Sequence, residues 1–487
     1  MKKQILVSVD RAETRVAILE DGQTAEAYIE RRGHRSVVGH VWKGRVENVL
    51  AGMEAAFIEI GLEKNGFLHV DEVVALGVPK RKRQIADLLK RGDEILVQAT
   101  KDPMGTKGVR LTMQLSLAGR FLVFVPYGDG VGVSRRLDDE ERDRLRKICK
   151  NLTKGEGGLI VRTQAAGVTE RELQRDVEAL RRLWAALQAR AEQVTAPSLL
   201  YSEADRSLKV IRDLFGDHVD EVLIDDEAQY TRILDFLRKT SPELAERIHF
   251  YAEPTPLMER YGVDRALRST LSRRADLKSG GYLIIDDTEA MTVIDVNSGR
   301  NVGRGKTTLE ETITQTNLEA AEEVVRQLRL RDIGGMIIVD FIDMNDQRNR
   351  HAVRQALEAA LERDRAKAYV VDISPLGLVE MTRQNISDGP REIMTEECPT
   401  CHGVGIIPSD ETHAVHVDRQ IRRKLAERSE TTFAVAVHPR VLDLVSGDDD
   451  AGVADIEAET GKRLRLEPDS ALEVDGVRID AIANGRK

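Results

Sequence analysis

The sequence has few cysteines and few aromatic residues: three Cys, and only 4% Phe, Trp and Tyr, among 487 residues. Three cysteines cannot build a disulfide framework, so we expect a reducing compartment, the cytoplasm. No apolar run approaches the ~20 residues that a membrane-spanning helix requires. The first residues, MKKQILVSVDRAETRV, lack the hydrophobic core of a secretory signal, so we expect neither export nor a membrane partner.

The sequence also has no surplus of basic residues. Asp and Glu number 83 against 73 Lys and Arg, which gives a net charge of -10 at pH 7. This balance excludes a protein coated in positive charge. Nucleic-acid binding stays open, because it depends on local patches and not on the sum. The length exceeds what one hydrophobic core accommodates and suggests about three domains.

Hydrophobic periodicity predicts mixed secondary structure. Two alternating runs flank Glu20-Asp21-Gly22, the pattern of a β-hairpin. Residues 36–113 contain short strands separated by glycines, which predicts a five-stranded barrel of the oligonucleotide-binding type. Residues 207–271 alternate helix and strand patterns and indicate an α/β layer.

Three further elements lie farther along or between these regions. Thr169 and Glu172 form a capping-box pair that starts a helix with apolar residues at helical spacing. Residues 280–299 predict a second hairpin. A long helix follows from about residue 308, and we expect the two glycines at 334 and 335 to end it.

A glycine- and lysine-rich loop lies in VIDVNSGRNVGRGKTT, residues 293–308. A nucleotide-binding P-loop needs a glycine at the position that Arg300 occupies, counting back from Gly305-Lys306. The pattern fails by one residue, so NTPase activity through Lys306 is not favoured. The role of the loop stays unassigned.

Carboxylates near this loop are the better candidates. Asp295 and Asn297 alternate along a strand and therefore share a face, whereas Val296 points into a core. Asp340 interrupts the apolar strand MIIVDFI, where burying an ion would cost several kcal/mol without compensation. A Mg²⁺ ion would compensate. Asp343 faces the opposite side if the strand continues. A turn residue and an arginine-paired aspartate fit the spacing equally well.

Two aromatic residues stand out in the predicted barrel. Phe57 and Phe67 could stack nucleobases, with Lys43, Arg45, Lys107 and the Lys80–Arg83 run guiding the phosphate backbone. By themselves, both phenylalanines are as readily explained as core residues, and the basic run as a solvated loop.

A cysteine pair occurs in CPTCHGVG as Cys398 and Cys401. This is half of a zinc site, because a structural zinc ion needs four ligands and Cys149 is far away along the chain. Two chains would complete a four-sulfur site across a two-fold axis. A thioredoxin-like redox pair and an unmetallated pair are the alternatives, although Pro399 and the trailing glycines favour the zinc site.

These segments together resemble the ribonuclease E/G family of bacterial endoribonucleases, and its shorter, ribonuclease G type. The resemblance covers nearly the whole chain and is carried by IDVNSG, TNLEAAEEVVRQLRLRDIGGMIIVDFIDM, GLVEMTRQ, CPTCHGVG, GMEAAFIEIG and GLIVRT. It implies an α/β and α+β multidomain chain. The implied parts are a split RNase H-like domain (1–35 and 208–271), an inserted S1-type OB barrel (36–113), a 5′-sensor (114–207), a DNase I-like catalytic domain (272–393), a zinc-link (394–408) and a small C-terminal domain (409–487).

The resemblance also implies roles for individual residues. Catalysis falls on Asp295, Asn297 and Asp340, with Mg²⁺ held by the two aspartates. Sensing of a 5′-phosphate falls on Arg162, Thr163, Gly119 and Val123, and RNA binding on Phe57, Phe67 and Lys107. Cys398 and Cys401 match the family's zinc link, a structural Zn²⁺ site shared between two protomers.

The implied function is Mg²⁺-dependent cutting of single-stranded RNA, stimulated by a 5′-monophosphate and leaving 5′-phosphate and 3′-hydroxyl ends. Expected substrates are ribosomal RNA precursors and mRNA, and the expected assembly is a homodimer, with pairing into tetramers left open. The chain ends after a compact domain, so we expect no degradosome-recruiting scaffold. The rival from another class is an RNA-binding scaffold with an inert site.

Overall fold

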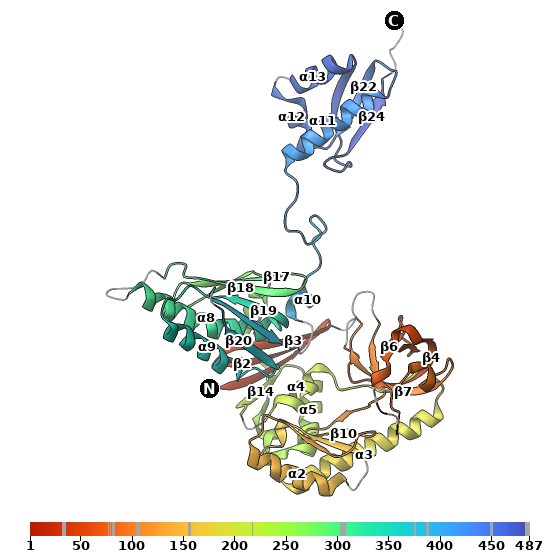
Figure 1. Ribbon diagram of the computed structural model, residues 1–487, viewed down its shortest axis with the longest axis vertical. Coiled ribbons are helices and arrows are strands. Elements are labelled where there is room, and N and C mark those ends of the chain that lie inside the picture. The colour runs from red at the N-terminus through yellow and green to blue at the C-terminus, as the bar shows by residue number, and fades with distance from the viewer. Residues whose placement is uncertain are drawn as a thin grey trace. The chain divides into compact units, whose positions relative to one another are not determined.

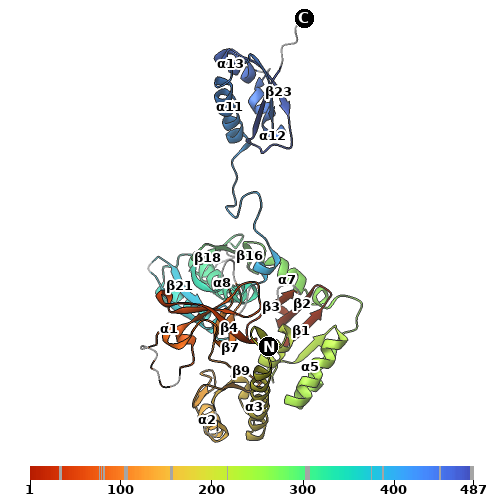
Figure 2. The same cartoon turned by 90° about the vertical axis from the view of Figure 1, so that its right-hand side faces the viewer.

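The computed structural model describes residues 1–31, 36–75, 77, 79, 83–103, 108–153, 157–216, 218–301, 308–374, 376–385, 389–448 and 451–482. The chain divides into two compact units, Met1–Met394 and Thr395–Lys487 (Figures 1 and 2). Among the described residues, none of the helices combines the length and the apolar character that crossing a membrane would require.

The first sheet joins two segments that are far apart in the sequence. Its strand order is β15-β14-β1-β2-β3. The N-terminal hairpin is confirmed, since Asp21 and Gly22 turn the chain with positive φ angles of 49° and 77°. The strands are β1 (Lys3–Val9), β2 (Glu13–Glu20), β3 (Gln23–Arg31), β14 (Glu221–Ile224) and β15 (Ile248–Phe250). The helices of this region are α4 (Arg206–Leu214), α5 (Glu227–Thr240), η5 (Pro242–Arg247), α6 (Leu257–Arg260) and α7 (Val263–Ser269).

The second sheet is the predicted five-stranded barrel. Its order is β4-β5-β6-β8-β7, and an additional pairing of β4 with β7 closes it. A sixth strand, β13 (Ser198–Tyr201), pairs with β4 from the outside, so the 114–207 region ends on the barrel. The barrel elements are β4 (Val41–Leu50), η1 (Ala51–Met53), β5 (Ala55–Glu59), β6 (Gly66–His69), η2 (Val70–Glu72), α1 (Ile85–Leu88), β7 (Glu94–Lys101) and β8 (Arg110–Thr112).

A small sheet of order β11-β12-β10-β9 follows the barrel, together with two helices. The capping box is confirmed, because the Thr169 hydroxyl accepts from the Glu172 N–H and the Glu172 carboxylate accepts from the Thr169 N–H. The elements are β9 (Leu117–Ala118), β10 (Leu122–Val125), β11 (Val131–Val133), α2 (Asp139–Thr153), β12 (Gly158–Val161), η4 (Thr163–Ala165) and α3 (Glu170–Gln193).

A six-stranded sheet, β16-β17-β18-β19-β21-β20, completes the first unit. Helices α8 and α9 lie along one side of it (Figure 1), where side chains such as Ile294 and Val339 are fully buried against Val324 and Leu328 of α8. The opposite face is open, since Tyr369 and Met336 are 68% and 51% exposed. The elements are β16 (Arg274–Asp276), β17 (Tyr282–Asp287), β18 (Met291–Asn297), α8 (Leu309–Arg331), β19 (Gly335–Asp340), α9 (Gln347–Leu361), β20 (Ala368–Ile373), β21 (Leu378–Arg383) and α10 (Pro390–Met394).

Helix α8 ends earlier than the glycines predicted. Its last residue is Arg331, and Asp332 takes the left-handed conformation with φ 51°. Aspartate tolerates this conformation better than most residues, so it ends the helix before Gly334 and Gly335.

A buried charge network fixes α8 and the segment after α9 against the first sheet. Arg329 of α8 contacts Glu20 of β2 and Glu26 of β3, each at 2.9 Å, and Arg365 contacts Glu26 at 2.5 Å. Burial opposes the charge of Glu26, but the two arginines outweigh it and lower the pKa of Glu26 to about 2. The network therefore stabilises this contact as an ionised cluster.

The second unit contains a three-stranded sheet of order β23-β22-β24 with helices around a core that includes Phe433 and Ile421. Its elements are α11 (Asp410–Ala426), β22 (Thr432–Val437), α12 (Pro439–Ser446), α13 (Ala451–Thr460), β23 (Arg463–Pro468) and β24 (Val477–Ala481).

Candidate active site

Asp295 and Asp340 lie next to each other on the open face of the six-stranded sheet. Strands β18 and β19 run parallel, and these two residues are register partners. Neighbouring strands are about 4.8 Å apart and register partners share a face. Both carboxylates are exposed at the carboxyl ends of their strands. Two acidic groups from distant parts of the chain thus converge, as the sequence suggested.

Asp340 is exposed, so no cost of burying its charge has to be compensated. The strand ends at Asp340, and the side chain is exposed while Val339 and Phe341 beside it are buried. Partial burial and the charges of Asp295 and Asp343 raise the pKa of Asp340. Asp343 therefore lies close enough to act on Asp340. Strand alternation, which placed it on the opposite side, stops applying where the strand ends.

The Asn297 side chain is oriented by Asp295. Its Nδ2 donates a hydrogen bond of 2.7 Å to Oδ2 of Asp295, so the two side chains point the same way. Val296 between them is 5% exposed and packs into the core, as the alternation predicted. The carboxamide fixes one carboxylate oxygen of Asp295.

A buried asparagine on α8 positions the segment after Asp340, and the sequence analysis missed it. Asn317 is fully buried. Its Nδ2 donates to the Ile342 carbonyl at 2.7 Å, and its Oδ1 accepts from the Ile342 N–H at 3.1 Å. This double contact anchors the backbone between Asp340 and Asp343. The available signal was a polar asparagine inside an otherwise periodic helix, where it is unfavourable unless it has a partner.

The donor set suits a hard divalent cation. Within the described residues, neither Asp295 nor Asp340 forms an ion pair, so the arginine-paired alternative is not supported. Two carboxylates and a carboxamide are the oxygen ligands that Mg²⁺ accepts, usually with several waters retained. Among the described residues, no group of three or more His, Cys, Asp or Glu is arranged to hold a metal. Any cation here would therefore have few protein ligands.

In the barrel, Phe57 and Phe67 are cross-strand partners with ring centroids 6.0 Å apart in an edge-to-face arrangement. Both are half-buried, so neither is a simple core residue. Phe57 also lines a surface pocket of about 410 Å³ with Glu47, Asn48, Asn65 and Arg91. Aromatic faces beside polar groups fit a single-stranded nucleic acid.

The basic residues around the barrel differ from the expectation. Lys43 forms an ion pair with Glu94 at 2.8 Å and donates to the Val194 carbonyl. Arg45 donates to the Ala196 carbonyl. These two side chains fasten the segment before β13, which makes them less available to a ligand. Lys107 and residues 80–82 of the basic run lie outside the described residues.

Arg162 and Gly119 of the proposed sensor come together. The Arg162 Nη1 donates to the Gly119 carbonyl at 2.8 Å, and its Nη2 pairs with Asp213 at 2.7 Å. Thr163 Oγ1 lies 3.0 Å from Ser134 Oγ. Val123 is on β10, whose partner strand β12 leads directly into Arg162. The four predicted residues therefore gather at one end of this small sheet.

Asp176 of α3 shapes the same region and was not anticipated. Its carboxylate accepts hydrogen bonds from the backbone N–H groups of Arg120, Phe121 and Leu122 at 2.9–3.3 Å. Burial raises the pKa of Asp176, although these three donors and Arg162 act in the opposite direction. A Cβ atom at Gly119 would lie 2.6 Å from this carboxylate. The turn thus requires a glycine there.

Cys398 and Cys401 lie in a loop that precedes α11, whose N-cap is Ser409. Backbone N–H groups of Cys401 and Thr400, followed by the Cys401 side chain, lower the pKa of Cys398. A lowered thiol pKa favours the thiolate that zinc binds. A redox pair would lie at a helix start, which this pair does not. Cys149 is buried in the other unit, where burial raises its pKa to about 11.

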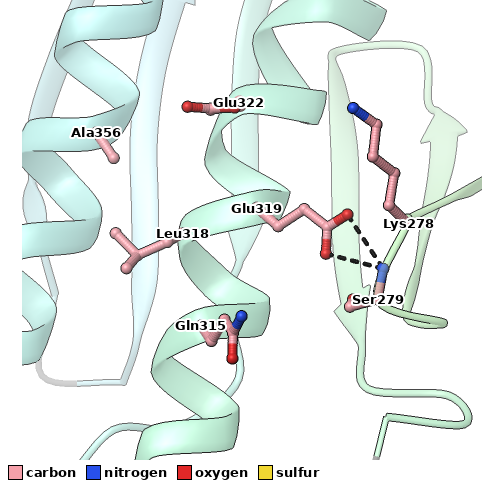
Figure 3. Close-up of a pocket in the computed structure, with 7 residues that line it drawn as sticks. All are labelled: Lys278, Ser279, Gln315, Leu318, Glu319, Glu322 and Ala356. Atoms are coloured by element: carbon pink, nitrogen blue, oxygen red, sulfur yellow. Dashed lines mark hydrogen bonds between the residues drawn. The ribbon is translucent and has the colours of Figure 1, made fainter.

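A larger pocket, of about 620 Å³, lies on the helix-covered side of the six-stranded sheet (Figure 3). It is lined by α8 and α9 and by the turn before β17, where Glu319 accepts from the Ser279 N–H at 3.2 Å. The carboxylates of Asp295 and Asp340 are on the opposite face. This pocket therefore does not belong to the candidate site.

Comparison with known proteins decides the family. A model described as "Ribonuclease E/G family" matches residues 116–386, and one described as "RNase E/G, Thioredoxin-like domain" matches residues 397–482. This chain belongs to the ribonuclease E/G family. It is accordingly an endoribonuclease, so the alternative of an inert RNA-binding scaffold is not supported.

Relatives of this ribonuclease E/G chain match along most of its length. Ribonuclease G of Salmonella typhimurium (strain SL1344) is 39% identical over 476 residues, which is 96% of this chain and 97% of that protein. Ribonuclease G of Escherichia coli (strain K12) matches equally well. Ribonuclease E of Nostoc sp. is 39% identical over 410 residues, covering 83% of this chain and 59% of that protein.

Proposed function

We propose that this ribonuclease E/G member is a Mg²⁺-dependent endoribonuclease that cuts single-stranded RNA in the processing of ribosomal RNA precursors and the decay of mRNA. The observation that carries the proposal is the in-register pairing of Asp295 with Asp340 on an open sheet face. Neither carboxylate has an arginine partner within the described residues, and the charge of one raises the pKa of the other. Such a pair gains most from a shared divalent cation.

Each residue at the site has a separate task. Asp295 and Asp340 hold the cation. Asn297 fixes the Asp295 carboxylate through its 2.7 Å hydrogen bond and presents its carboxamide oxygen to the attacking water or to the scissile phosphate. When bound, Mg²⁺ supplies charge that stabilises the anion growing at phosphorus and favours loss of a proton from water. Because water attacks, the products carry a 5′-phosphate and a 3′-hydroxyl.

The RNA 5′ end is read by the region around Arg162. The guanidinium is held by Gly119 and Asp213, and the hydroxyl of the next residue, Thr163, lies beside Ser134. A planar guanidinium and a hydroxyl both donate to phosphate oxygens. An RNA with a 5′-monophosphate is therefore preferred over one with a 5′-hydroxyl.

The remaining parts assist. The barrel, an S1-type OB domain, stacks bases on Phe57 and Phe67, with Lys107 as a backbone contact. Residues 1–35 with 208–271 form an RNase H-like domain, and 272–393 a DNase I-like domain. Cys398 and Cys401 of two protomers hold one structural Zn²⁺ and link a cytoplasmic homodimer. The four-ligand requirement of zinc and the two thiols that each chain supplies from this loop support this stoichiometry.

One cleavage assay tests the proposal. Oligoribonucleotides that differ only in a 5′-monophosphate or a 5′-hydroxyl are incubated with the full chain, with Mg²⁺ and with EDTA. We expect cutting only with Mg²⁺, faster for the 5′-monophosphate, and product ends that a 5′-phosphate-dependent exonuclease degrades. Cutting in EDTA, or products with 2′,3′-cyclic phosphate ends, would rule the proposed chemistry out.

A further inference from the structure

The open face of the six-stranded sheet carries a second feature beside the aspartates. Tyr282 of β17 is the register partner of Asn297, and the direct partner of Asp295 is Ile284. Tyr282 is thus a diagonal neighbour of Asp295 on the same face, about 7–8 Å away. A nucleotide next to a phosphate bound at Asp295 is therefore within reach of Tyr282.

Tyr282 is covered by an arginine in a stacking position. The guanidinium carbon of Arg274 lies 3.9 Å from the centre of the Tyr282 ring. Arg274 is on β16, which pairs with β17, and its partner Ile284 places it on the same face. The Arg274 Nε donates to Asp276 at 2.8 Å, and Asp276 is the register partner of Tyr282. The aspartate holds the guanidinium over the ring.

The outer side of this guanidinium is available. The Arg274 side chain is 52% exposed, although its ring contact and its ion pair with Asp276 are both formed. Helices α8 and α9 pack on the other side of this sheet, and Arg391 of α10 contacts it at Asp287, at the opposite end of β17 from Tyr282. Bases in single-stranded RNA stack on arginine planes as well as on aromatic rings. The Arg274 guanidinium therefore offers a flat, positively charged surface beside the candidate site, on which a base can stack.

We propose that Arg274 and Tyr282 form a stacking platform for the nucleobase of one nucleotide that flanks the scissile phosphate. This inference rests on the proposed function, because it needs the phosphate at Asp295 and Asp340. Tyr282 supports Arg274 from below, Asp276 orients it, and the base lies on the outer guanidinium face. The platform holds the strand on the catalytic face and reads the presence of a base, not its identity.

The first arm of the test uses protein variants in the full chain. Arg274→Lys keeps the charge and removes the flat guanidinium, and Tyr282→Leu removes the supporting ring. We expect each to raise KM for a short 5′-hydroxyl RNA about tenfold, within the range of one stacked base. Tyr282→Phe keeps the ring and should behave as the unchanged chain. The matched control is Tyr369→Leu, exposed on the same face but near the other end of the strands, which should change nothing.

The second arm uses RNA with one abasic nucleotide, moved stepwise past the cleavage site. For the unchanged chain, placing the abasic nucleotide at one position that flanks the cleavage site should raise KM about tenfold. When the abasic nucleotide is at that position, and only then, Arg274→Lys and Tyr282→Leu should not raise KM any further, because the base that would stack is already absent. Equal losses for intact and abasic RNA, or no loss, would overturn the platform.

The third arm separates this inference from the proposed function. Asp295→Asn is assayed on the same RNAs. Suppose that Asp295→Asn abolishes cutting, but that Arg274→Lys and Tyr282→Leu lose as much on abasic RNA as on intact RNA. The stacking platform is then refuted, and the nuclease site is retained. If Asp295→Asn cuts normally, the nuclease site falls first and the platform with it.

Discussion

Asp295 and Asp340 are register partners on two parallel, adjacent strands, β18 and β19. Parallel strands bring their carboxyl ends to the same edge of a sheet. Asp295 and Asp340 therefore meet at this edge, although the whole of α8 separates them along the chain. Strands β18 and β19 and the α8 crossover form a rigid frame with a buried core. The chemistry at this edge depends on that frame.

Asn317 connects helix α8 of this frame to the loop after Asp340. Asn317→Leu removes both hydrogen bonds to Ile342 and leaves the half-buried N–H and carbonyl of Ile342 without these partners. We expect a loss of about 1–3 kcal/mol in the free energy of unfolding and a fall in kcat larger than any rise in KM. Chemical denaturation and steady-state cleavage measure the two. A kcat unchanged despite the lost stability would show that the loop needs no such anchor.

The charge network around Glu26 predicts a dependence of stability on pH. The pKa of Glu26 is lowered from 4.5 to about 2 in the folded chain, because Arg365 and Arg329 outweigh the opposing effect of burial. The lowered pKa means that this contribution, roughly 3 kcal/mol, is complete above pH 4.5 and is lost as pH falls toward 2.

Glu26→Gln tests this contribution. We expect the variant to be less stable at pH 7 and its stability to fall less steeply below pH 4.5 than that of the unchanged chain. The exposed pair Arg91 and Glu47 provides the control, since Glu47→Gln should leave the pH profile as it was. Parallel profiles for Glu26→Gln and the unchanged chain would contradict the assignment.

Gly119 offers a test of the 5′-end reader. In Gly119→Ala, the new Cβ would lie 2.6 Å from the Asp176 carboxylate, which caps three backbone N–H groups of the adjoining turn. We expect the preference for 5′-monophosphate over 5′-hydroxyl RNA to fall severalfold while cleavage of the 5′-hydroxyl RNA is retained. Gly132→Ala is the matched control, because its Cβ would meet nothing closer than 3.7 Å. An unaltered preference in Gly119→Ala would refute the assignment.

The cysteine pair predicts an assembly that depends on metal. Cys398→Ser should give a monomer with less than one zinc ion per two chains, as measured by light scattering and elemental analysis. Cys149→Ala, which removes a buried thiol that does not share the loop, should keep both dimer and zinc. A wild-type dimer that persists without metal would count against the shared site.

Parts of the fold and site followed from the sequence because they depend on local patterns. The β2–β3 hairpin, the capping box at Thr169 and the barrel closure all rest on turn residues, caps and short glycine-punctuated strands. The alternation that placed Asp295 and Asn297 on one face also held, because β18 continues through both.

Other features required the tertiary structure. The apolar neighbours of Asp340 left open whether its charge is buried, and only the structure shows that those neighbours face the core while Asp340 faces the open side. Asp343 was placed on the opposite side only on the condition that the strand continues, and β19 ends at Asp340, so alternation does not apply to it. Lys43 and Arg45 looked available for a ligand, but they contact Glu94 and the segment before β13, which is distant in sequence. Contacts of this kind carry no local signal.

The most direct measurement concerns the two aspartates as a unit. Single-turnover Mg²⁺-dependent cleavage is compared for Asp295→Asn, Asp340→Asn and the double variant, with Asp286→Asn, an exposed residue of β17 paired with Arg273, as control. If both carboxylates hold one ion, each single change removes nearly all cleavage, the double change costs little more, and RNA affinity persists. Normal cleavage by either single variant, or losses that simply multiply, would contradict a shared ion.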